Sequence, residues 1–419
     1  MTLDILCKVV DNYGDAGVVL RLARALSELP DPPALRVVTD GPEAFRALGL
    51  PVDPALDAQP FGSLPEARLY AWRGAGPAEA AVPSGSAAPH PDFVRSPPRV
   101  VVECFACGRP DWLDELLFDP ADGEPRLVVN LEHLTAEHWA VELHRMLSAT
   151  RSGAVRKRIF MPGFVDGTGG LVLDRSFRAS LAFWRPLRDA ASPGSPAARE
   201  ALAAARADLS RRAGLALPDG AERDFWVPVF SYEHDYRDMA ADLSAYARES
   251  GRAVTVLAAP GRSGDSARRA FGRGLEGLRL VPLPFLPQET WDELVLASDF
   301  PIVRGEDSWA RAALGGEPFL WHAYLQEGAH QQVKVRAFLD ALAPFVAPPG
   351  AAAFAALERL HLAFNERLAD SPDSGGAEGL LPVLRSLQAL KPGFAAFSDS
   401  LAARGDLAAH LMTFLREIV

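Results

Sequence analysis

The N-terminal stretch Leu3-Asp-Ile-Leu-Cys-Lys-Val-Val-Asp-Asn-Tyr-Gly-Asp-Ala-Gly17 determines the expected fold class. Leu3 to Val10 is an apolar run rich in Ile, Leu and Val, which is typical of a buried parallel strand. Asp11 to Gly17 follows as a turn, and residues 18–29 then have the periodicity of an amphipathic helix. A strand, a short loop and a helix in this order predict a doubly wound α/β domain.

The same alternation continues along the chain and predicts two Rossmann-like halves facing one cleft. Amphipathic helices are expected at 238–250 and 288–297, and helical sequence resumes at 380–419. The further expected strands are at 35–38, 99–103, 127–131, 225–230, 253–257, 278–283 and 300–303.

Changes in composition indicate where the parts meet. Residues 74–98 are rich in Ala, Gly, Pro and Ser and suit an irregular surface loop, while the Ala/Arg/Pro-rich residues 186–218 suit a connection. We therefore expect a first domain, a linker, a second domain and a C-terminal helix that packs back on the first domain, at 1–190, 191–218, 219–395 and 396–419.

The composition is that of a soluble globular protein. Of 419 residues, 48% are hydrophobic and 23% charged, which excludes a disordered or fibrous protein. A net charge of −11 disfavours non-specific binding to nucleic acid or to an anionic membrane. Because the sequence also has neither a signal-peptide pattern nor a run of 18 apolar residues, we expect a cytoplasmic protein with no membrane partner.

Three cysteines are too few for a disulfide framework in a chain of this size. Cys104 and Cys107 form a C-x-x-C pair, but neither the helix of a redox motif nor two further zinc ligands stand nearby. We expect these two residues to be buried structural thiols in a reduced protein.

The first candidate site is the loop Asp11-Asn-Tyr-Gly-Asp15-Ala-Gly17, at the carboxyl end of the first strand. Ligands bind at this edge in open α/β sheets. The loop lacks the G-x-G-x-x-G fingerprint, and two carboxylates would repel a phosphate, so they suit a cation or a proton to be removed. The alternative is structural: Asp11 ends the strand and Asp15 caps the following helix. The pattern alone does not decide between them.

The second candidate is Val303-Arg-Gly-Glu-Asp-Ser-Trp309, directly after an apolar strand. Arg304 beside a helix N-terminus suits a diphosphate clamp, and Glu306 could accept hydrogen bonds from ribose hydroxyls. The alternative is a plain helix capped by Asp307 or Ser308, with a surface ion pair.

Aromatic residues form the third candidate. Tyr232 and Phe285 follow expected strands and could stack a base, and the Gln288 amide could bind a pyrimidine edge; the alternative is that these rings are simply core. His322 and His330 are interpreted as packed or capping groups. The sequence has no H-E-x-x-H, G-x-S-x-G, Walker A or D-x-D motif, which argues against a metalloprotease, an α/β-hydrolase, a P-loop NTPase and a metal-dependent sugar transferase.

Taken together, six blocks resemble the bacterial protein-arginine rhamnosyltransferases that modify elongation factor P. The blocks are Leu6–Val18, Asn130-Leu-Glu132, Phe160-Met-Pro-Gly-Phe164, Thr168-Gly-Gly-Leu171, Phe285-Leu-Pro-Gln288 and Val303-Arg-Gly-Glu-Asp-Ser308. The resemblance implies an inverting glycosyltransferase of the GT-B type, with two Rossmann-like domains facing a central cleft. It also implies transfer of L-rhamnose from dTDP-β-L-rhamnose to one arginine of elongation factor P, which relieves ribosome stalling at polyproline. The N-terminal half would take the protein acceptor and the C-terminal half the nucleotide sugar, with no cofactor or metal ion.

The family's site residues carry over onto matching positions. Asp11 and Asp15 match the two loop aspartates, with Asp15 the favoured catalytic base. Residues of the same loop would support them: Asn12, Tyr13, Gly14 and Gly17. The implied donor contacts are Tyr232, Phe285, Gln288, Arg304, Glu306, Asp307 and Ser308. The chain departs from the family pattern at Tyr13 (usually Phe), His133 (Tyr), His234 (Asn) and Leu325 (Pro).

Two rival hypotheses remain at the level of sequence. One is a related GT-B transferase acting on a small molecule or a lipid, and the other is a catalytically inactive nucleotide-binding scaffold. The aspartate pair distinguishes the arginine rhamnosyltransferase from both rivals, because a hydroxyl acceptor needs only one base and a binding module needs none.

Overall fold

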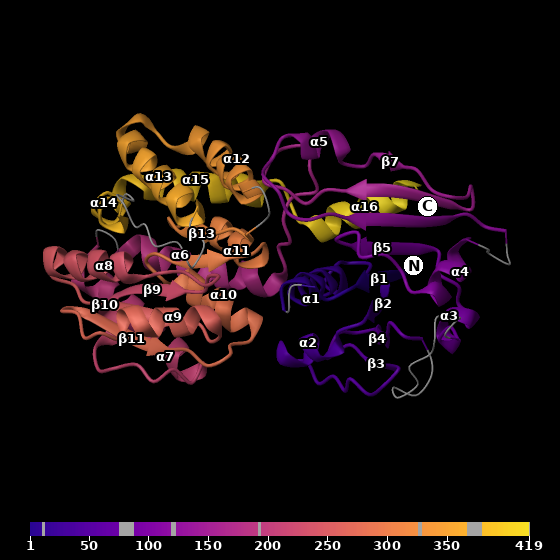
Figure 1. The fold of residues 1–419 in the computed structure, drawn as a ribbon, viewed down its shortest axis with the longest axis horizontal. Helices are drawn as coiled ribbons and strands as arrows, with labels where there is room; N and C mark the ends of the chain where they lie inside the picture. The colour runs from indigo at the N-terminus through magenta and orange to yellow at the C-terminus, as the bar shows by residue number, and fades with distance from the viewer. Residues whose placement is uncertain are drawn as a thin grey trace. The chain divides into compact units, whose positions relative to one another are not determined.

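The computed structural model describes residues 1–10, 13–74, 88–118, 123–191, 194–325, 329–366 and 379–418. The chain forms two compact units (Figure 1). Unit 1 comprises Met1–Arg175 together with Arg404–Val419, and unit 2 comprises Ser176–Ala403. The chain therefore passes from unit 1 to unit 2 after residue 175 and returns after residue 403.

Unit 1 is built on an eight-stranded sheet in the order β3-β4-β2-β1-β5-β6-β8-β7. The six central strands are parallel, and β3 and β7 pair antiparallel at the two edges. Its strands are β1 (Thr2–Cys7), β2 (Ala34–Thr39), β3 (Ala58–Pro60), β4 (Ala67–Ala71), β5 (Val100–Cys104), β6 (Arg126–Leu131), β7 (Leu147–Ser148) and β8 (Val155–Phe160).

The C-terminal helix belongs to unit 1 because its apolar face is part of that unit's core. Leu411 and Leu415 of α16 share a buried cluster with Leu3 and Leu22, and α16 packs against α1 (Figure 1). The helices of unit 1 are α1 (Gly14–Ser27), α2 (Pro42–Ala47), α3 (Pro91–Arg95), α4 (Asp111–Phe118), α5 (Trp139–Leu143) and α16 (Leu407–Ile418).

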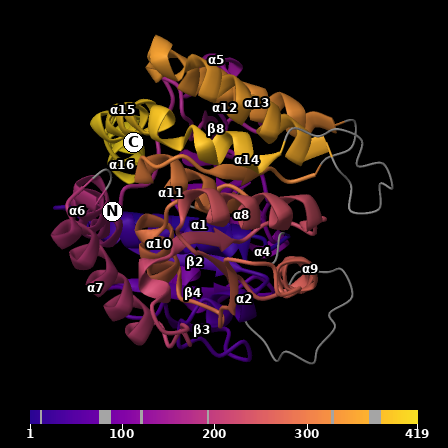
Figure 2. The same cartoon turned by 90° about the vertical axis from the view of Figure 1, so that its left-hand side faces the viewer.

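Unit 2 has a five-stranded, fully parallel sheet in the order β11-β10-β9-β12-β13. Its strands are β9 (Phe225–Val229), β10 (Val254–Ala258), β11 (Leu278–Pro282), β12 (Ile302–Arg304) and β13 (Leu320–His322). Helices α12 and α13 lie side by side, and α13 lies against the edge strand β13 (Figure 1 and Figure 2). The helices are α6 (Arg175–Ala191), α7 (Pro196–Arg212), η1 (Ala221–Arg223), α8 (Arg237–Ser250), α9 (Arg262–Phe271), α10 (Gln288–Ala297), α11 (Asp307–Gly315), α12 (His330–Leu342), η3 (Ala343–Phe345), η4 (Pro348–Gly350), α13 (Ala351–Glu366), α14 (Leu380–Arg385) and α15 (Leu387–Ala403).

The predicted α/β class is confirmed, and the expected strands and helices are present with bounds shifted by a few residues. Strand β8 was not predicted, because three cations, Arg156 to Arg158, occupy its centre. Lys157 is accommodated by an ion pair of 2.7 Å with Glu103, a carboxylate that is 1% exposed. Within the loop predicted at 74–98, residues 75–87 lie outside the described residues and α3 occupies part of the rest.

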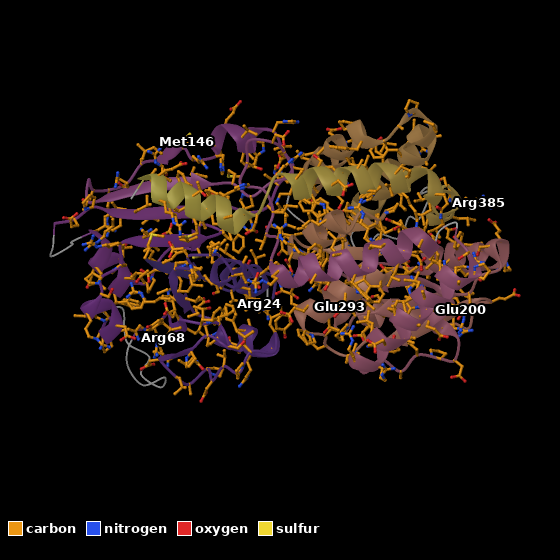
Figure 3. All side chains as sticks on the ribbon, turned by 180° about the vertical axis from the view of Figure 1, so that it is seen from behind. Arg24, Arg68, Met146, Glu200, Glu293 and Arg385 are labelled. Atoms are coloured by element: carbon orange, nitrogen blue, oxygen red, sulfur yellow. The ribbon has the colours of Figure 1, made fainter. Side chains whose placement is uncertain are left out.

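Ion pairs lie on the surface of unit 2. Glu200 and Glu293, which are labelled in Figure 3, each take part in one. Each accepts from an arginine at 2.7 Å, Arg223 and Arg212 respectively. Such exposed pairs contribute little to stability, so the apolar core holds the elements in place. Within the described residues, no helix is both long and apolar enough to cross a membrane.

Both sheets have a point where the strand order reverses. In unit 1 the chain places β2 on one side of β1 and β5 on the other, and in unit 2 it places β10 on one side of β9 and β12 on the other. Helices leave opposite faces at such a point and open a crevice at the carboxyl ends of the strands. The loops after β1, β9 and β12 are therefore the positions where this fold binds ligands.

Candidate active site

The first candidate loop begins where β1 ends in unit 1. Asp11 and Asn12 lie outside the described residues. Tyr13 occupies the N-cap position of α1 with its side chain 45% exposed, and Asp15 lies half-buried in the first turn. The Oδ2 atom of Asp15 accepts a hydrogen bond of 2.8 Å from the Val10 N–H. The interpretation of Asp15 as the helix cap is therefore wrong, because its carboxylate turns back to the end of the strand.

The two glycines of the loop lie inside the start of α1. Gly14 is its first residue and is exposed, whereas Gly17 is buried and its N–H donates to the Tyr13 carbonyl at 2.9 Å. The helix thus begins directly at the carboxyl edge of the sheet, so its N-terminal turn carries Asp15 to that edge.

A second carboxylate at this edge comes from the neighbouring strand and was not among the predicted site residues. Asp40 follows β2, and its Oδ1 atom accepts a hydrogen bond of 2.8 Å from the Val9 N–H. Gly41 packs closely on Val9, since an added Cβ would lie 2.7 Å from its Cγ2 atom. Successive amides of the loop are thus held by two carboxylates. The available signal was that β1 and β2 were both expected to be parallel strands, whose ends share one edge.

The C-x-x-C segment follows β5, the other neighbour of β1. Both thiols are free, and they pack into different hydrophobic clusters: Cys104 is buried with Leu3 and Leu22, and half-buried Cys107 packs with Leu6. Burial raises the pKa of both thiols, that of Cys107 to about 12. Neither thiol is therefore an activated nucleophile, in agreement with a structural role.

The same segment contains a strained turn. Phe105 and Ala106 have φ values of +61° and +50°, a conformation that side chains disfavour. The Asn130 side chain holds the turn by accepting from the Ala106 N–H at 2.9 Å. His133, one of the departures from the family pattern, stacks on Phe105 with ring centroids 4.6 Å apart. The block at 130–132 thus braces a turn beside the β1 loop.

In unit 2, Arg304 ends β12 and extends over rings from the end of β9. Its guanidinium carbon lies 4.4 Å from the ring centroid of Phe230 and 4.8 Å from that of Tyr232. One guanidinium N–H also donates to the Ser231 carbonyl at 3.5 Å. The structure therefore brings together Arg304 and Tyr232, two predicted residues about 70 positions apart, and orients a cation at the switch point.

The loop after Arg304 leads directly into a helix. Gly305 has a φ of +62°, Glu306 occupies the N-cap position, and α11 begins at Asp307. The prediction that Asp307 or Ser308 caps this helix is therefore wrong. Asp307 instead accepts a hydrogen bond of 2.9 Å from the Gln288 side-chain amide, and Ser308 is buried in the first turn.

Gln288 and Phe285 come from the segment between β11 and α10. Gln288 is 8% exposed, and its side-chain amide is held by the Asp307 carboxylate. Phe285 is 47% exposed, so its ring is accessible from solvent. Of the two, Gln288 is built into the site and Phe285 is presented at its surface.

A further aromatic residue at this edge was not predicted. Tyr324 follows β13, is 56% exposed, and lies edge-to-face with Tyr232 at a centroid distance of 5.5 Å. The signal was present, because Tyr324 stands just after an apolar run as Tyr232 does.

A buried imidazole packs beside the Tyr232 ring, and a second imidazole packs beside the first. His322 is completely buried 5.4 Å from the Tyr232 ring, as its interpretation as a packed group expected. Burial is the main cause that lowers the pKa of His322 to about 3, and neither of its ring nitrogens has a hydrogen-bond partner among the described residues. His234, another departure from the family pattern, packs on Phe364 at 4.2 Å.

Comparison with known proteins covers the whole chain. Residues 3–416 match the family described as Elongation-Factor P (EF-P) rhamnosyltransferase EarP. The protein-arginine rhamnosyltransferase of Pseudomonas aeruginosa is 32% identical over 421 residues, covering 98% of both chains. That of Pseudomonas putida is 34% identical over 353 residues, covering 81% of this chain and 80% of the relative.

A solved structure described as "Structural basis for EarP-mediated arginine glycosylation of translation elongation factor EF-P" is also similar. It is 22% identical, covers 100% of this chain and 99% of its own, and has a TM-score of 0.54. This likeness establishes the fold, which is α/β of the GT-B type. The chain therefore belongs to the EarP family of elongation factor P rhamnosyltransferases, and its enzyme class is that of the protein-arginine rhamnosyltransferases.

Proposed function

We propose that this enzyme transfers L-rhamnose from dTDP-β-L-rhamnose to one arginine side chain of elongation factor P, with inversion at the anomeric carbon. The observation that carries the proposal is the opposite charge at the two switch points: Asp15 after β1 and Arg304 after β12. A cationic acceptor is bound by negative charge, and an anionic leaving group is stabilised by positive charge. The family description, and that of the solved relative, support elongation factor P as the acceptor.

Unit 1 would bind the acceptor arginine, which is a poor nucleophile. Its guanidinium pKa exceeds ~12, so less than about 10⁻⁵ of it is neutral at pH 7. Asp15 would take the proton while the guanidine nitrogen bonds to the anomeric carbon, and Asp11 would orient the cation as the second carboxylate. The bond to the phosphate oxygen breaks at the same time, its electron pair leaves with dTDP, and attack from the opposite face inverts the configuration.

Unit 2 would bind the donor. Arg304 and the N-terminal turn of α11 would stabilise the charge on the departing diphosphate, which a metal ion does in other transferases. Phe285 would stack the thymine, and the Gln288 side chain, which Asp307 holds in place, would bind the edge of that base. Glu306 would bind the ribose, and Ser308 the phosphate.

Intact mass of purified elongation factor P tests the proposal, after incubation with this enzyme and dTDP-β-L-rhamnose. We expect one added deoxyhexose on one arginine, with the α configuration at its anomeric carbon by NMR. An unchanged mass refutes the proposal, and transfer only to a small-molecule or lipid acceptor supports the rival enzyme. The modified factor would relieve stalling at polyproline, and the enzyme would act in the cytoplasm.

A further inference from the structure

Trp321 connects the edge strand of unit 2 to the loop that carries Arg304. It lies on β13, is 2% exposed, and stacks on Trp309 of α11 with ring centroids 3.7 Å apart and planes 8° apart. Its indole N–H donates a hydrogen bond of 2.9 Å to the Gly305 carbonyl. One buried side chain therefore determines where the carbonyl of the left-handed Gly305 points.

The direction of that carbonyl decides the direction of the next amide. In a trans peptide the C=O and the following N–H point in opposite directions. Since the Gly305 carbonyl points to the buried indole, the Glu306 N–H points away from the tryptophan stack. Gly305 has a φ of +62° and Glu306 is right-handed, with φ −94° and ψ −43°. Successive residues of opposite hand turn their N–H groups toward one concave side, an arrangement that binds anions.

Trp321 is itself held by side chains, because β13 is the last strand of its sheet. The Trp321 N–H donates to His361 Nε2 at 3.2 Å, and its carbonyl accepts from the Asn365 amide at 2.9 Å. Asn365 also accepts from the Ala323 N–H at 2.8 Å. Both residues lie on α13, so this helix takes the place of a neighbouring strand and fixes the height of Trp321 along the edge.

We propose that Trp321 is a positioning residue for the donor: its indole N–H holds the Gly305 peptide so that the Glu306 amide faces the diphosphate of the nucleotide sugar. The inference rests on the proposed function, since it assumes that a nucleoside diphosphate sugar binds at this loop. If the indole hydrogen bond is lost, the peptide is free to turn its carbonyl toward the phosphates, which repels them. The effect falls on donor binding and not on acceptor binding.

The test compares Trp321→Phe with Trp309→Phe. Both changes remove one indole from the same stack and keep an aromatic ring, but only the first removes the donor to Gly305. We expect Trp321→Phe to weaken dTDP binding in calorimetry about tenfold, the effect of one well-made hydrogen bond, and to raise the donor KM equally with the acceptor KM unchanged. Trp309→Phe should bind dTDP as the wild type does. Equal affinities in the two variants would overturn the proposal.

A second pair of variants tests the proposal if the tryptophan variants do not fold. Gly305→Ala strains the left-handed conformation of this residue, although its Cβ would meet nothing closer than 3.7 Å. Gly251→Ala imposes the same strain at φ +66°, with open space around it, at the end of α8. Only Gly305→Ala should lose dTDP affinity, and equal affinity in the two variants contradicts the proposal. A wild-type enzyme that does not bind dTDP would instead refute the proposed function.

Discussion

The loops after β1 and after β12 both lie at the switch points of their sheets, yet they carry opposite charge. The first presents the carboxylates of Asp15 and Asp40, each holding an amide of the strand end. The second presents the Arg304 guanidinium over two aromatic rings. The fold thus determines where a ligand binds, and the residue types at that position determine whether it is a cation or an anion.

The supports of the two loops also differ. The β1 loop is held by charged groups near the surface, whereas the β12 loop is held by the buried, neutral side chains of Trp321 and His361. A change of charge should therefore affect chemistry in unit 1, and a change of packing or of protonation should affect binding in unit 2.

The largest effect should come from Asp15→Asn. The asparagine oxygen can still accept from the Val10 N–H, so the fold and the thermal midpoint should be kept. Loss of the proton acceptor should lower single-turnover rhamnosylation by ~10²–10⁴-fold, the usual contribution of a positioned base. Affinity for dTDP, measured in parallel, should not change. A variant within about threefold of the wild-type rate would show that the base lies elsewhere.

Arg304→Ala should affect donor binding at the β12 loop of unit 2. Hydrogen bonds to charged groups contribute roughly 1.5–3 kcal/mol, so dTDP affinity and turnover should fall together by about 10- to 100-fold. Arg304→Lys keeps the charge but loses the planar fork, and should lie between the alanine variant and the wild type. If calorimetry showed wild-type dTDP affinity in the alanine variant, Arg304 would not be a donor-binding residue.

Acid should destabilise unit 2 through its buried imidazoles. Burial lowers the pKa of His361 to about 4 and that of His322 to about 3, against ~6.5 in the unfolded chain. Below pH 6.5 the unfolded chain binds protons that the folded chain does not, so stability is complete above pH 6.5 and falls as the pH drops toward 4.

Because of each buried imidazole, the free energy of unfolding should be lower at pH 5 than at pH 7 by up to about 2 kcal/mol. Urea unfolding at the two pH values measures this loss. His361→Gln should flatten the pH dependence, while the same change at the exposed His330 should leave it intact. An equally steep dependence in His361→Gln would show that His361 does not carry it.

A smaller effect is expected at Asp40 of the β1 loop. Asp40→Ala removes the acceptor for the Val9 N–H, and one hydrogen bond of this kind contributes ~0.5–1.5 kcal/mol. The acceptor KM should rise by about 2- to 10-fold while dTDP affinity is unchanged. Asp53→Ala is the matched control, since Asp53 is an exposed aspartate of the same unit that also accepts from a backbone amide, that of Ala55. Equal acceptor KM values in the two variants would exclude a role for Asp40.

Removal of divalent metal ions should have no effect. If Arg304 and the start of α11 stabilise the leaving diphosphate, rhamnosylation should proceed at the same rate with EDTA as without it. Activity that disappears in EDTA and returns only with Mg²⁺ or Mn²⁺ would show that the charge at the β12 loop is not sufficient.

The strand ends of both units could be predicted from the sequence because they are local features. A parallel strand buried on both faces is a continuous apolar run, and the polar residues that follow it must lie at the carboxyl edge. That pattern placed Asp15, Tyr232 and Arg304 correctly at sheet edges. The directions of the side chains were predicted less well, since Asp15, Asp307 and Ser308 were all candidate helix caps and none occupies that position.

The sequence by itself determined the order of elements and the charge of each loop, since both depend on residues adjacent in the chain. Only the tertiary structure decided that Asp40 holds the β1 loop, that Asp307 engages Gln288, and that Trp321 bonds to the Gly305 carbonyl. Each of these contacts joins residues between 16 and 31 positions apart, on different elements. A polar side chain forms its hydrogen bond with whichever group packing brings within about 3 Å, and strand order and helix packing decide which group that is.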